Sequence, residues 1–550
     1  MSEHVTGPMM GHMMDQPLLI SSIIRHADRH FGKNEIVSRR IEGDIHRYTY
    51  SQCHQRARKL ANALVALGIK KGERIATLAW NGYRHLEIYY AVSGSGAVLH
   101  TINPRLFVDQ IAYIANHADD QYLFFDLNFL PLVESFAAQC PRLKGFVMMC
   151  DKDRMTDSST IPNLICYEDL IDQHSDEYSW PALDENAASS LCYTSGTTGN
   201  PKGVLYSHRS TVLHAFALVF PDAFNISARD SILPVVPMFH VNAWGVPYAA
   251  PLTGAKLVLP GAALDGKSIY ELCEQEQVSI TAGVPTVWQN LLTYVNQNKL
   301  KFSFLKRVII GGSACPPSMM AAFRDNHGIE AVQAWGMTEV SPLGTVCKLQ
   351  TRHLHLPKAE QDTLLQKQGH ALFGVDMKIV DDNDNDLPWN GKTYGHLLVR
   401  GLWVIDHYFN DKGNTPLQDG WFPTGDVATI DGDGYMQITD RSKDVIKSGG
   451  EWIGTIDLEN VATSHPAVLQ AACFGVYHPK WDERPLLIVV KRSGMDVGKD
   501  ELIQFYKGKV ASWWTPDDVQ FVEALPIGAT GKVLKTKLRE QFKNYQFPVV

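Results

Sequence analysis

Apolar residues recur along the first part of the chain in two alternating patterns. Between residues 51 and 69 they return every three or four positions, which places them on one face of a helix that stops at Gly68. The positions on that face are Ala57, Leu60, Ala61, Leu64 and Leu67. The continuous apolar run at residues 74–81 is typical of a buried strand.

The same alternation of helix and strand continues to about residue 370. Further strand-like runs occupy residues 97–103, 122–127, 145–150, 231–239, 255–260, 279–288 and 307–314. Segments with the apolar periodicity of a helix separate several of these runs. Strands that alternate with helices favour an α/β architecture with largely parallel sheets.

The character of the sequence changes twice after this region. From about residue 370 short strands and turns dominate, as at residues 397–404 and 425–438, which indicates a small third layer. The segment after residue 443 has strand and helix signals of its own, at residues 471–477, 485–491 and 499–513. At roughly 110 residues it is long enough to form a separate lid.

Composition narrows the class of protein. The chain has 550 residues, 45% of them hydrophobic and 20% charged, as expected of a globular protein with two to four structural units. A net charge of -8 gives no broad basic field, so we expect no nucleic-acid partner. The nine cysteines form no C-x-x-C pairs, and neither a signal peptide nor an integral membrane segment is predicted. These features favour the cytoplasm.

A glycine- and hydroxyl-rich loop, YTSGTTGNPKGV, occupies residues 193–204. Glycine lets backbone N–H groups approach a ligand, and the hydroxyls and one lysine add donors, which favours a cradle for polyphosphate. The Walker pattern G-x-x-x-x-G-K-[ST] fails, because Pro201 and Val204 stand where its second glycine is required. A solvated linker is the alternative, but the strand-like run directly before the loop argues against it.

Two other stretches, which could be taken for a calcium-binding loop and a nucleophile elbow, do not match those motifs. The acidic run at residues 381–386 has Leu387 where a calcium loop needs glycine and Thr393 where it needs glutamate, so we predict a polar hairpin turn. The GGSAC stretch at residues 311–315 has Cys315 where a nucleophile elbow needs glycine. The sequence therefore excludes a hydrolase at that position.

Four further stretches complete a nucleotide site. Trp335 could stack on a base and Glu339 could hold Mg²⁺ against phosphate oxygens. The carboxylate of Asp426 could accept both ribose hydroxyls, Arg441 could contact sugar or phosphate, and Lys532 lies on a glycine turn. Each of these residues alone would more often be a solvated or packed side chain. Together with the loop they predict an ATP site.

These motifs occur in the order found in the adenylate-forming superfamily, which the chain resembles from about residue 15 to 545. That superfamily contains acyl-CoA synthetases, luciferases and peptide-synthetase adenylation domains. The stretches at residues 18–30, 235–245 and 474–486 look like those of bacterial medium- and long-chain fatty acyl-CoA synthetases and 3-methylmercaptopropionate-CoA ligases. Trp335, where many relatives have tyrosine, fits this subgroup.

The resemblance implies a fold and a reaction. Residues 1–439 would form an N-terminal adenylation domain of α/β subdomains with a small β-barrel-like subdomain. Residues 440–443 would be a hinge, and residues 444–550 a mobile α+β lid. The carboxylate of the substrate would attack the α-phosphorus of ATP, giving an acyl-adenylate and pyrophosphate. The thiol of coenzyme A would then displace AMP, after the lid has rotated about Lys443.

The resemblance also implies the roles of single residues. The catalytic residues would be Lys532, His240, Thr338 and Glu339. Nucleotide contacts would come from Thr194, Ser195, Gly196, Thr197, Thr198, Gly199, Lys202, Gly312, Ser313, Trp335, Gly336, Met337, Asp426, Arg441, Lys443, Lys447 and Trp452. Thr194 and Glu339 would carry Mg²⁺. The acyl substrate would contact His240, Trp244, Gly311 and Gly336, and coenzyme A would contact Gly449 and Gly450.

Several alternatives stay open from sequence alone. An adenylating enzyme that loads a free carrier protein and a luciferase-like oxygenase would share the same ATP site. We expect no appended carrier domain, and nothing in the sequence points to oxygen chemistry, so a ligase of small-molecule acids is favoured. Trp244 could be a core residue or a gate of the acyl tunnel. Neither the acyl chain length nor the oligomeric state follows from the sequence, although a homodimer is compatible with it.

Overall fold

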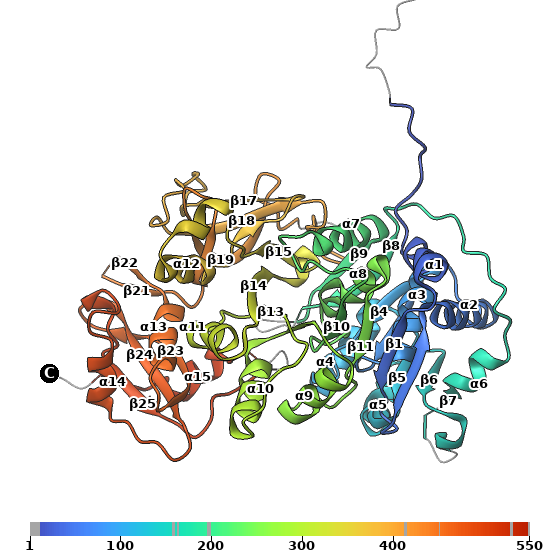
Figure 1. Cartoon of the computed structure of the whole chain (residues 1–550), viewed down its shortest axis with the longest axis horizontal. Helices are drawn as coiled ribbons and strands as arrows, with labels where there is room; N and C mark the ends of the chain where they lie inside the picture. Colours follow the sequence, from blue (N-terminus) through green and yellow to red (C-terminus); the bar gives the residue numbers. More distant parts are fainter. Residues whose placement is uncertain are drawn as a thin grey trace, which may run out of the picture.

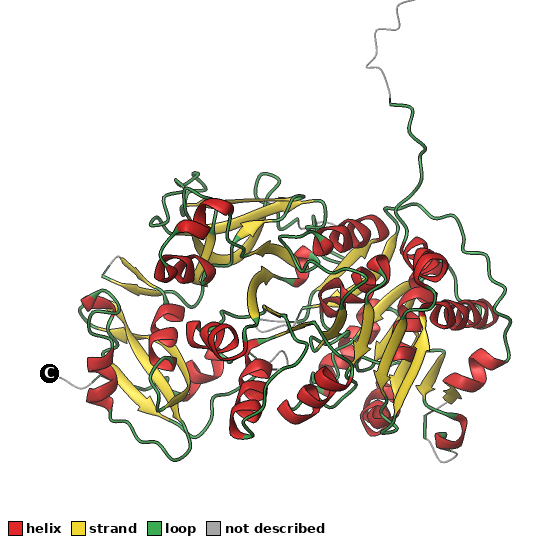
Figure 2. Ribbon diagram, in the orientation of Figure 1, coloured by secondary structure: helices red, strands yellow, loops and turns green. Residues whose placement is uncertain are grey.

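The computed structural model describes residues 11–156, 160–161, 164–194, 200–411, 415–449, 451–528 and 532–547. Within these ranges the chain forms three sheets up to Arg441 and a fourth in the C-terminal region, with helices packed against them (Figures 1 and 2). This arrangement confirms the predicted α/β class. None of the helices in the described ranges is both long and apolar enough to span a bilayer.

The first large sheet has seven strands, which are parallel except for the pairing of β8 with β9. In spatial order they are β7 (Leu164–Cys166), β6 (Gly145–Met149), β5 (Asp120–Asp126), β3 (Arg74–Leu78), β4 (Val98–Thr101), β8 (Ala188–Tyr193) and β9 (Gly203–Ser207). Its helices are α2 (Tyr50–Ala66), α3 (Tyr83–Ser95), α4 (Val108–Ala118), α5 (Leu130–Phe136) and α6 (Tyr167–Asp172). The predicted phosphate loop joins β8 to β9 at one edge of this sheet.

The second large sheet has nine strands, parallel in its centre and antiparallel at its ends. They are β16 (His370–Ala371), β15 (Leu343–Val346), β14 (Glu330–Gly336), β13 (Arg307–Ile310), β12 (Ile280–Gly283), β10 (Ser231–Pro234), β11 (Lys256–Leu259), β1 (Glu35–Arg39) and β2 (Ile45–Thr49). The helices of this region are α1 (Ile20–Phe31), α7 (His208–Val219), α8 (Val246–Thr253), α9 (Gly266–Gln275), α10 (Pro285–Gln297), α11 (Pro317–Ala321) and α12 (Lys358–Leu365).

Three of the predicted strands are too long. The runs at residues 231–239 and 307–314 are strands only over β10 and β13. The apolar run at residues 279–288 is a strand only over β12, because Pro285 opens helix α10 directly afterwards. Proline favours the first turn of a helix, where its missing N–H leaves no intrahelical bond unmade.

The third sheet is antiparallel and small, as predicted for the region after residue 370. It contains β17 (Val375–Val380), β18 (Gly395–Gly401), β19 (Phe422–Ile430) and β20 (Met436–Arg441). The acidic run after β17 is a polar turn, because Asp381 accepts hydrogen bonds from the backbone N–H groups of Asn383 and Asn385. No cluster of metal-ligating side chains forms anywhere in the described residues.

The C-terminal region has a sheet and a core of its own. Its strands are β22 (Glu451–Ile453), β21 (Ile446–Ser448), β24 (Asp482–Lys491), β23 (Val468–His478) and β25 (Asp518–Phe521), and its helices are α13 (Thr455–Thr463), α14 (Lys499–Phe505) and α15 (Lys535–Gln541). Buried residues such as Leu458, Leu487 and Val519 form a cluster separate from the main core. A separate core is what a lid would need, although the hinge at residues 440–443 stays a prediction.

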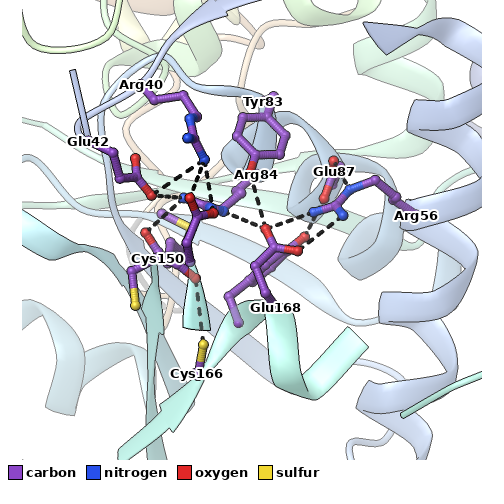
Figure 3. Close-up of polar contacts among 12 residues, drawn as sticks. Arg40, Glu42, Arg56, Tyr83, Arg84, Glu87, Cys150, Cys166 and Glu168 are labelled. Carbon is purple, nitrogen blue, oxygen red and sulfur yellow. Dashed lines mark hydrogen bonds and ion pairs between the residues drawn. The ribbon is translucent and has the colours of Figure 1, made fainter. Parts of the chain in front are cut away.

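A buried ion network ties α2, α3 and α6 together (Figure 3). Arg84 pairs with Glu168 at 2.7 Å and with Glu42 at 2.6 Å, and Arg56 pairs with Glu87 at 2.7 Å. Such networks add little net stability over an apolar core, but removing one partner costs about 3–5 kcal/mol. The network therefore fixes how these helices pack beside the seven-stranded sheet.

Candidate active site

A cavity of about 960 Å³ lies where the two large sheets, the small sheet and the C-terminal region meet. Most residues predicted for the site line it. They are Thr194, Lys202, His240, Trp244, Gly311, Gly312, Trp335, Gly336, Met337, Thr338, Glu339, Arg441, Lys443 and Lys532. Segments separated by more than three hundred positions in the sequence thus line one cavity.

Trp335, Asp426 and Arg441 form a connected group at the nucleotide end. The indole Nε1 of Trp335 donates to Asp426 Oδ2 at 2.9 Å, and Arg441 Nε lies 3.0 Å from Asp426 Oδ1. Burial raises the pKa of Asp426, although the charge of Arg441 opposes the shift. Asp426 lies behind the cavity wall and is not part of its lining. The structure therefore shows it orienting Trp335 and Arg441, while its contact with ribose stays a prediction.

The indole ring of Trp335 packs against Gly344, a neighbour that sequence reasoning missed. A Cβ atom at Gly344 would lie 2.7 Å from Cε3 of that ring, which is too close for any side chain. Gly336 is required for a similar reason, because its Cβ would meet the carbonyl oxygen of Pro342 at 2.1 Å. These two glycines let β14 and β15 approach closely and hold the indole in place.

Glu339 is buried directly after β14, in the short helical turn Thr338–Val340. Its Oε1 accepts a hydrogen bond from the Tyr408 hydroxyl at 2.9 Å, and burial raises its pKa. The ammonium group of Lys202 lies over the Tyr408 ring, 4.6 Å from its centroid. Tyr408, which the sequence motifs did not reveal, thus joins the acid of one motif to the lysine of another.

The phosphate loop is closed at its base. The backbone N–H of Thr194 donates to the Lys202 carbonyl at 2.9 Å, and the Lys202 N–H donates to Thr194 Oγ1 at 3.1 Å. These bonds bring the two ends of the loop together beside the cavity. The other predicted loop residues, Ser195, Gly196, Thr197, Thr198 and Gly199, lie outside the described residues.

Lys532 reaches this site from the C-terminal region. Its side chain is accessible from the cavity but surrounded by protein, and this burial, with the nearby charge of Arg441, lowers its pKa to about 8. Asp426 and Glu339 oppose the shift. The Gly528 N–H donates to the Lys532 carbonyl at 2.7 Å. Lys532 thus contributes to the cavity lining an ammonium group that loses its proton more readily than an ordinary lysine does.

His240 directly precedes an unusual turn that carries Trp244, and both side chains line the cavity. Burial, together with the cations of Lys532 and Arg105, lowers the pKa of His240 to about 4, so its imidazole is neutral near pH 7. Trp244 is buried, and a Cβ atom at Gly311 would lie 3.1 Å from its Cη2. Residues 241–244 all have positive φ angles between 45° and 55°. Each such residue costs roughly 1–2 kcal/mol relative to ordinary helical geometry.

The remaining predicted residues lie away from the cavity lining. Gly449 precedes the β22 strand and Trp481 covers it, since a Cβ there would lie 2.9 Å from that ring. The Lys447 ammonium lies 5.8 Å from the ring centroid of Trp452. Ser313 is also absent from the lining. Gly450 lies outside the described residues, so the roles given to this hairpin stay predictions.

Sequence profiles of two families match the chain. The profile described as AMP-binding enzyme matches residues 24–409, and that described as AMP-binding enzyme C-terminal domain matches residues 457–532. The first covers more than half of the chain and spans the phosphate loop, Trp335 and Glu339.

Characterised relatives match over nearly their whole length. A 3-methylmercaptopropionyl-CoA ligase of Ruegeria lacuscaerulensis is 55% identical, covering 98% of this chain and 99% of the relative. A medium-chain-fatty-acid–CoA ligase of Ectopseudomonas oleovorans is 53% identical, covering 97% and 98%. Among solved structures, the anthranilate CoA ligase AuaEII in complex with anthranoyl-AMP matches with a TM-score of 0.86 at 23% identity, covering 96% and 98%. At that identity the last match shows a shared fold.

Proposed function

Because the chain belongs to the family of AMP-binding enzymes, we propose that its cavity activates a straight-chain, apolar carboxylic acid for transfer to coenzyme A. The enzyme is an ATP-dependent acid–CoA ligase that works through an acyl-adenylate. The observation that carries the substrate class is the cavity itself, whose lining combines the charged side chains of Lys532 and Glu339 with apolar side chains such as Phe224, Val241 and Trp244. Medium-chain fatty acids and 3-methylmercaptopropionate have the matching shape, with one anionic head and a slender apolar tail.

In the first half-reaction the protein brings two anions together. The ammonium group of Lys532 lines the cavity, where it would neutralise the carboxylate and the α-phosphate as they approach. Lys202 and the loop amides would hold the outer phosphates, and Arg441 and Trp335 would hold the nucleoside. His240 is neutral and can donate or accept one hydrogen bond at the carboxylate without adding charge.

The residues present fit a magnesium ion. Mg²⁺ prefers one or two protein oxygens together with phosphate oxygens, and Glu339 with the Thr194 hydroxyl offers such a set at the edge of the phosphate loop. The Tyr408 hydroxyl holds one carboxylate oxygen of Glu339, which orients the other. When bound, the ion would neutralise phosphate charge and order the polyphosphate.

In the second half-reaction we expect the C-terminal region to rotate about Lys443. Lys443 lines the cavity and follows β20, so a change in its backbone angles would move Lys532 away from the site. The hairpin of β21 and β22 would replace it, and the predicted coenzyme A residues Gly449 and Gly450 would then line the path of the pantetheine thiol. Loading of a carrier protein and luciferase-like oxygen chemistry remain the weaker alternatives.

We also propose a cytoplasmic location and leave a homodimer as a hypothesis. All nine cysteines are buried and free, which suits a reducing compartment. Light scattering of the purified protein would measure the oligomeric state directly.

The proposed order of steps predicts pyrophosphate exchange without coenzyme A. Adenylation precedes thiol attack, so ATP and a straight-chain acid alone should incorporate labelled pyrophosphate into ATP. The exchange should depend on the acid and should need no thiol. Exchange that requires coenzyme A would contradict the two-step reaction, and product formed only with a carrier protein would favour the alternative ligase.

Trp244→Ala should change the chain-length profile. The indole lines the cavity and packs against Gly311, so we expect its removal to add room for longer acids and to lose contacts with shorter ones. We expect the ratio of kcat/KM for long over short acids to rise by about tenfold or more. A panel of carboxylates from acetate to palmitate, including 3-methylmercaptopropionate, measures it. An unchanged chain-length profile would show that Trp244 is a core residue and not a gate of the acyl tunnel.

A further inference from the structure

The turn that carries Trp244 has a backbone that needs an external support. Val241, Asn242, Ala243 and Trp244 are four successive residues in the left-handed region, with φ angles of 45°, 51°, 48° and 55°, and Gly245 follows at 81°. Residues other than glycine visit this region singly, and not as a helical turn. A segment of this kind persists only where its surroundings over-determine it, and such segments cluster at functional sites.

The support comes from the side chain of Asn242, which is buried with 5% exposure. Its Nδ2 donates to Ser190 Oγ at 3.0 Å. Its Oδ1 accepts from the Cys192 thiol at 3.4 Å, and the Tyr89 hydroxyl lies 3.2 Å from the same oxygen. These partners lie on β8 and α3, so one amide ties the turn to two elements of the seven-stranded sheet region.

Asparagine suits this position in two ways. Its short polar side chain makes the left-handed conformation more accessible than it is for most residues. Its amide also offers a donor and an acceptor on one rigid plane, which the hydroxyl of Ser190 and the donors near Oδ1 require. Alanine would lose both properties, whereas removing the Ser190 hydroxyl would weaken only the hydrogen bond.

The neighbours of the turn leave its position little freedom. Gly245 packs so closely on His214 that a Cβ would lie 2.8 Å from the imidazole ring. On the other side the Trp244 indole covers Gly311 at contact distance. With Asn242 anchored, the turn keeps the backbone of Trp244 in place, and the indole packs against Gly311 in the lining of the cavity.

We propose that Asn242 is a positioning residue that sets the acyl-length limit by holding the left-handed turn, and through it Trp244, at the end of the cavity. This inference rests on the proposed ligase function. Asn242 has no place in the cavity lining, so it acts on the acyl chain through Trp244 alone. Releasing the anchor lets the turn relax towards ordinary geometry and frees the indole from the acyl end.

The test compares Asn242→Ala and Ser190→Ala with the parent on the same acid panel. We expect the ratio of kcat/KM for long over short acids to rise about tenfold in Asn242→Ala and by a smaller factor in Ser190→Ala. Asn225→Ala is the matched control, because Asn225 is also left-handed, with φ of 54°, but is exposed on the surface. The ratio of kcat/KM for long over short acids in Asn225→Ala should equal that of the parent, whatever the change in its free energy of unfolding.

A double-mutant cycle with Trp244→Ala separates this role from a merely structural one. If Asn242 acts through Trp244, adding Ser190→Ala or Asn242→Ala to Trp244→Ala should leave the ratio unchanged. Additive changes, or single variants that lose activity equally for all acids, would overturn the inference while leaving the ligase function intact. Ser190→Ala keeps the test decisive if Asn242→Ala does not fold. A parent that forms no thioester with any acid would instead disprove the proposed function.

Discussion

Lys532→Ala should reduce formation of acyl-CoA from acid, ATP and coenzyme A by about a hundredfold or more. Lys532 is a cation that the C-terminal region contributes to the cavity lining, and loss of one such electrostatic contact in a transition state costs roughly 3 kcal/mol or more. Thioester formation from a synthetic acyl-adenylate and coenzyme A should stay near the parent rate, because the lysine is expected to leave the site before the thiol attacks.

Two further measurements sharpen this prediction. Lys537→Ala, on the exposed side of the neighbouring helix α15, is the matched control and should leave both half-reactions unchanged. Since the pKa of Lys532 is about 8, the free enzyme loses this charge as the pH rises through 8. The value of kcat/KM for ATP should therefore fall on the alkaline side in the parent, and this limb should vanish in Lys532→Ala. Equal loss in both half-reactions would contradict the rotating lid.

Periodicity predicts the elements that are determined locally. The face with Leu60 and Leu64 is buried in α2, and the run at residues 74–81 contains β3, because each pattern repeats with the geometry of its own element. The strand predicted at residues 279–288 ends before Pro285, where helix α10 begins. An apolar run fits both a buried strand and the first turn of a buried helix. Apolar composition alone does not distinguish those two environments.

The site residues divide in the same way. Trp335, Glu339 and Lys532 belong to short motifs with chemistry in their own side chains, so the sequence identifies them. The sequence does not identify Tyr408 and Asn242, because their roles depend on contacts with residues far along the chain. Tyr408 contacts Glu339 across 69 positions, and Asn242 contacts Ser190 across 52. Only the folded chain shows that these side chains hold the motif residues in place.

Glu339→Gln should raise the apparent Mg²⁺ requirement of adenylation by at least about tenfold. Loss of residues that merely orient a ligand already costs 10–100-fold in metal affinity, and this change removes the charge of the proposed ligand itself. Glutamine keeps the shape of Glu339 and can still accept the Tyr408 hydrogen bond. The effect should therefore come from charge and not from repacking of the cavity wall.

The metal titration of pyrophosphate exchange distinguishes this role from a structural one. Burial raises the pKa of Glu339, so in the parent the Mg²⁺ requirement should also increase as the pH falls towards that pKa, because a protonated carboxyl is a poor metal ligand. Tyr408→Phe should give an intermediate shift, since it frees the carboxylate without removing it. Glu330→Gln, at an exposed glutamate that begins strand β14 and pairs with Lys348, should titrate like the parent. A Glu339→Gln enzyme with an unchanged Mg²⁺ titration and reduced activity would show that Glu339 shapes the site without holding the metal.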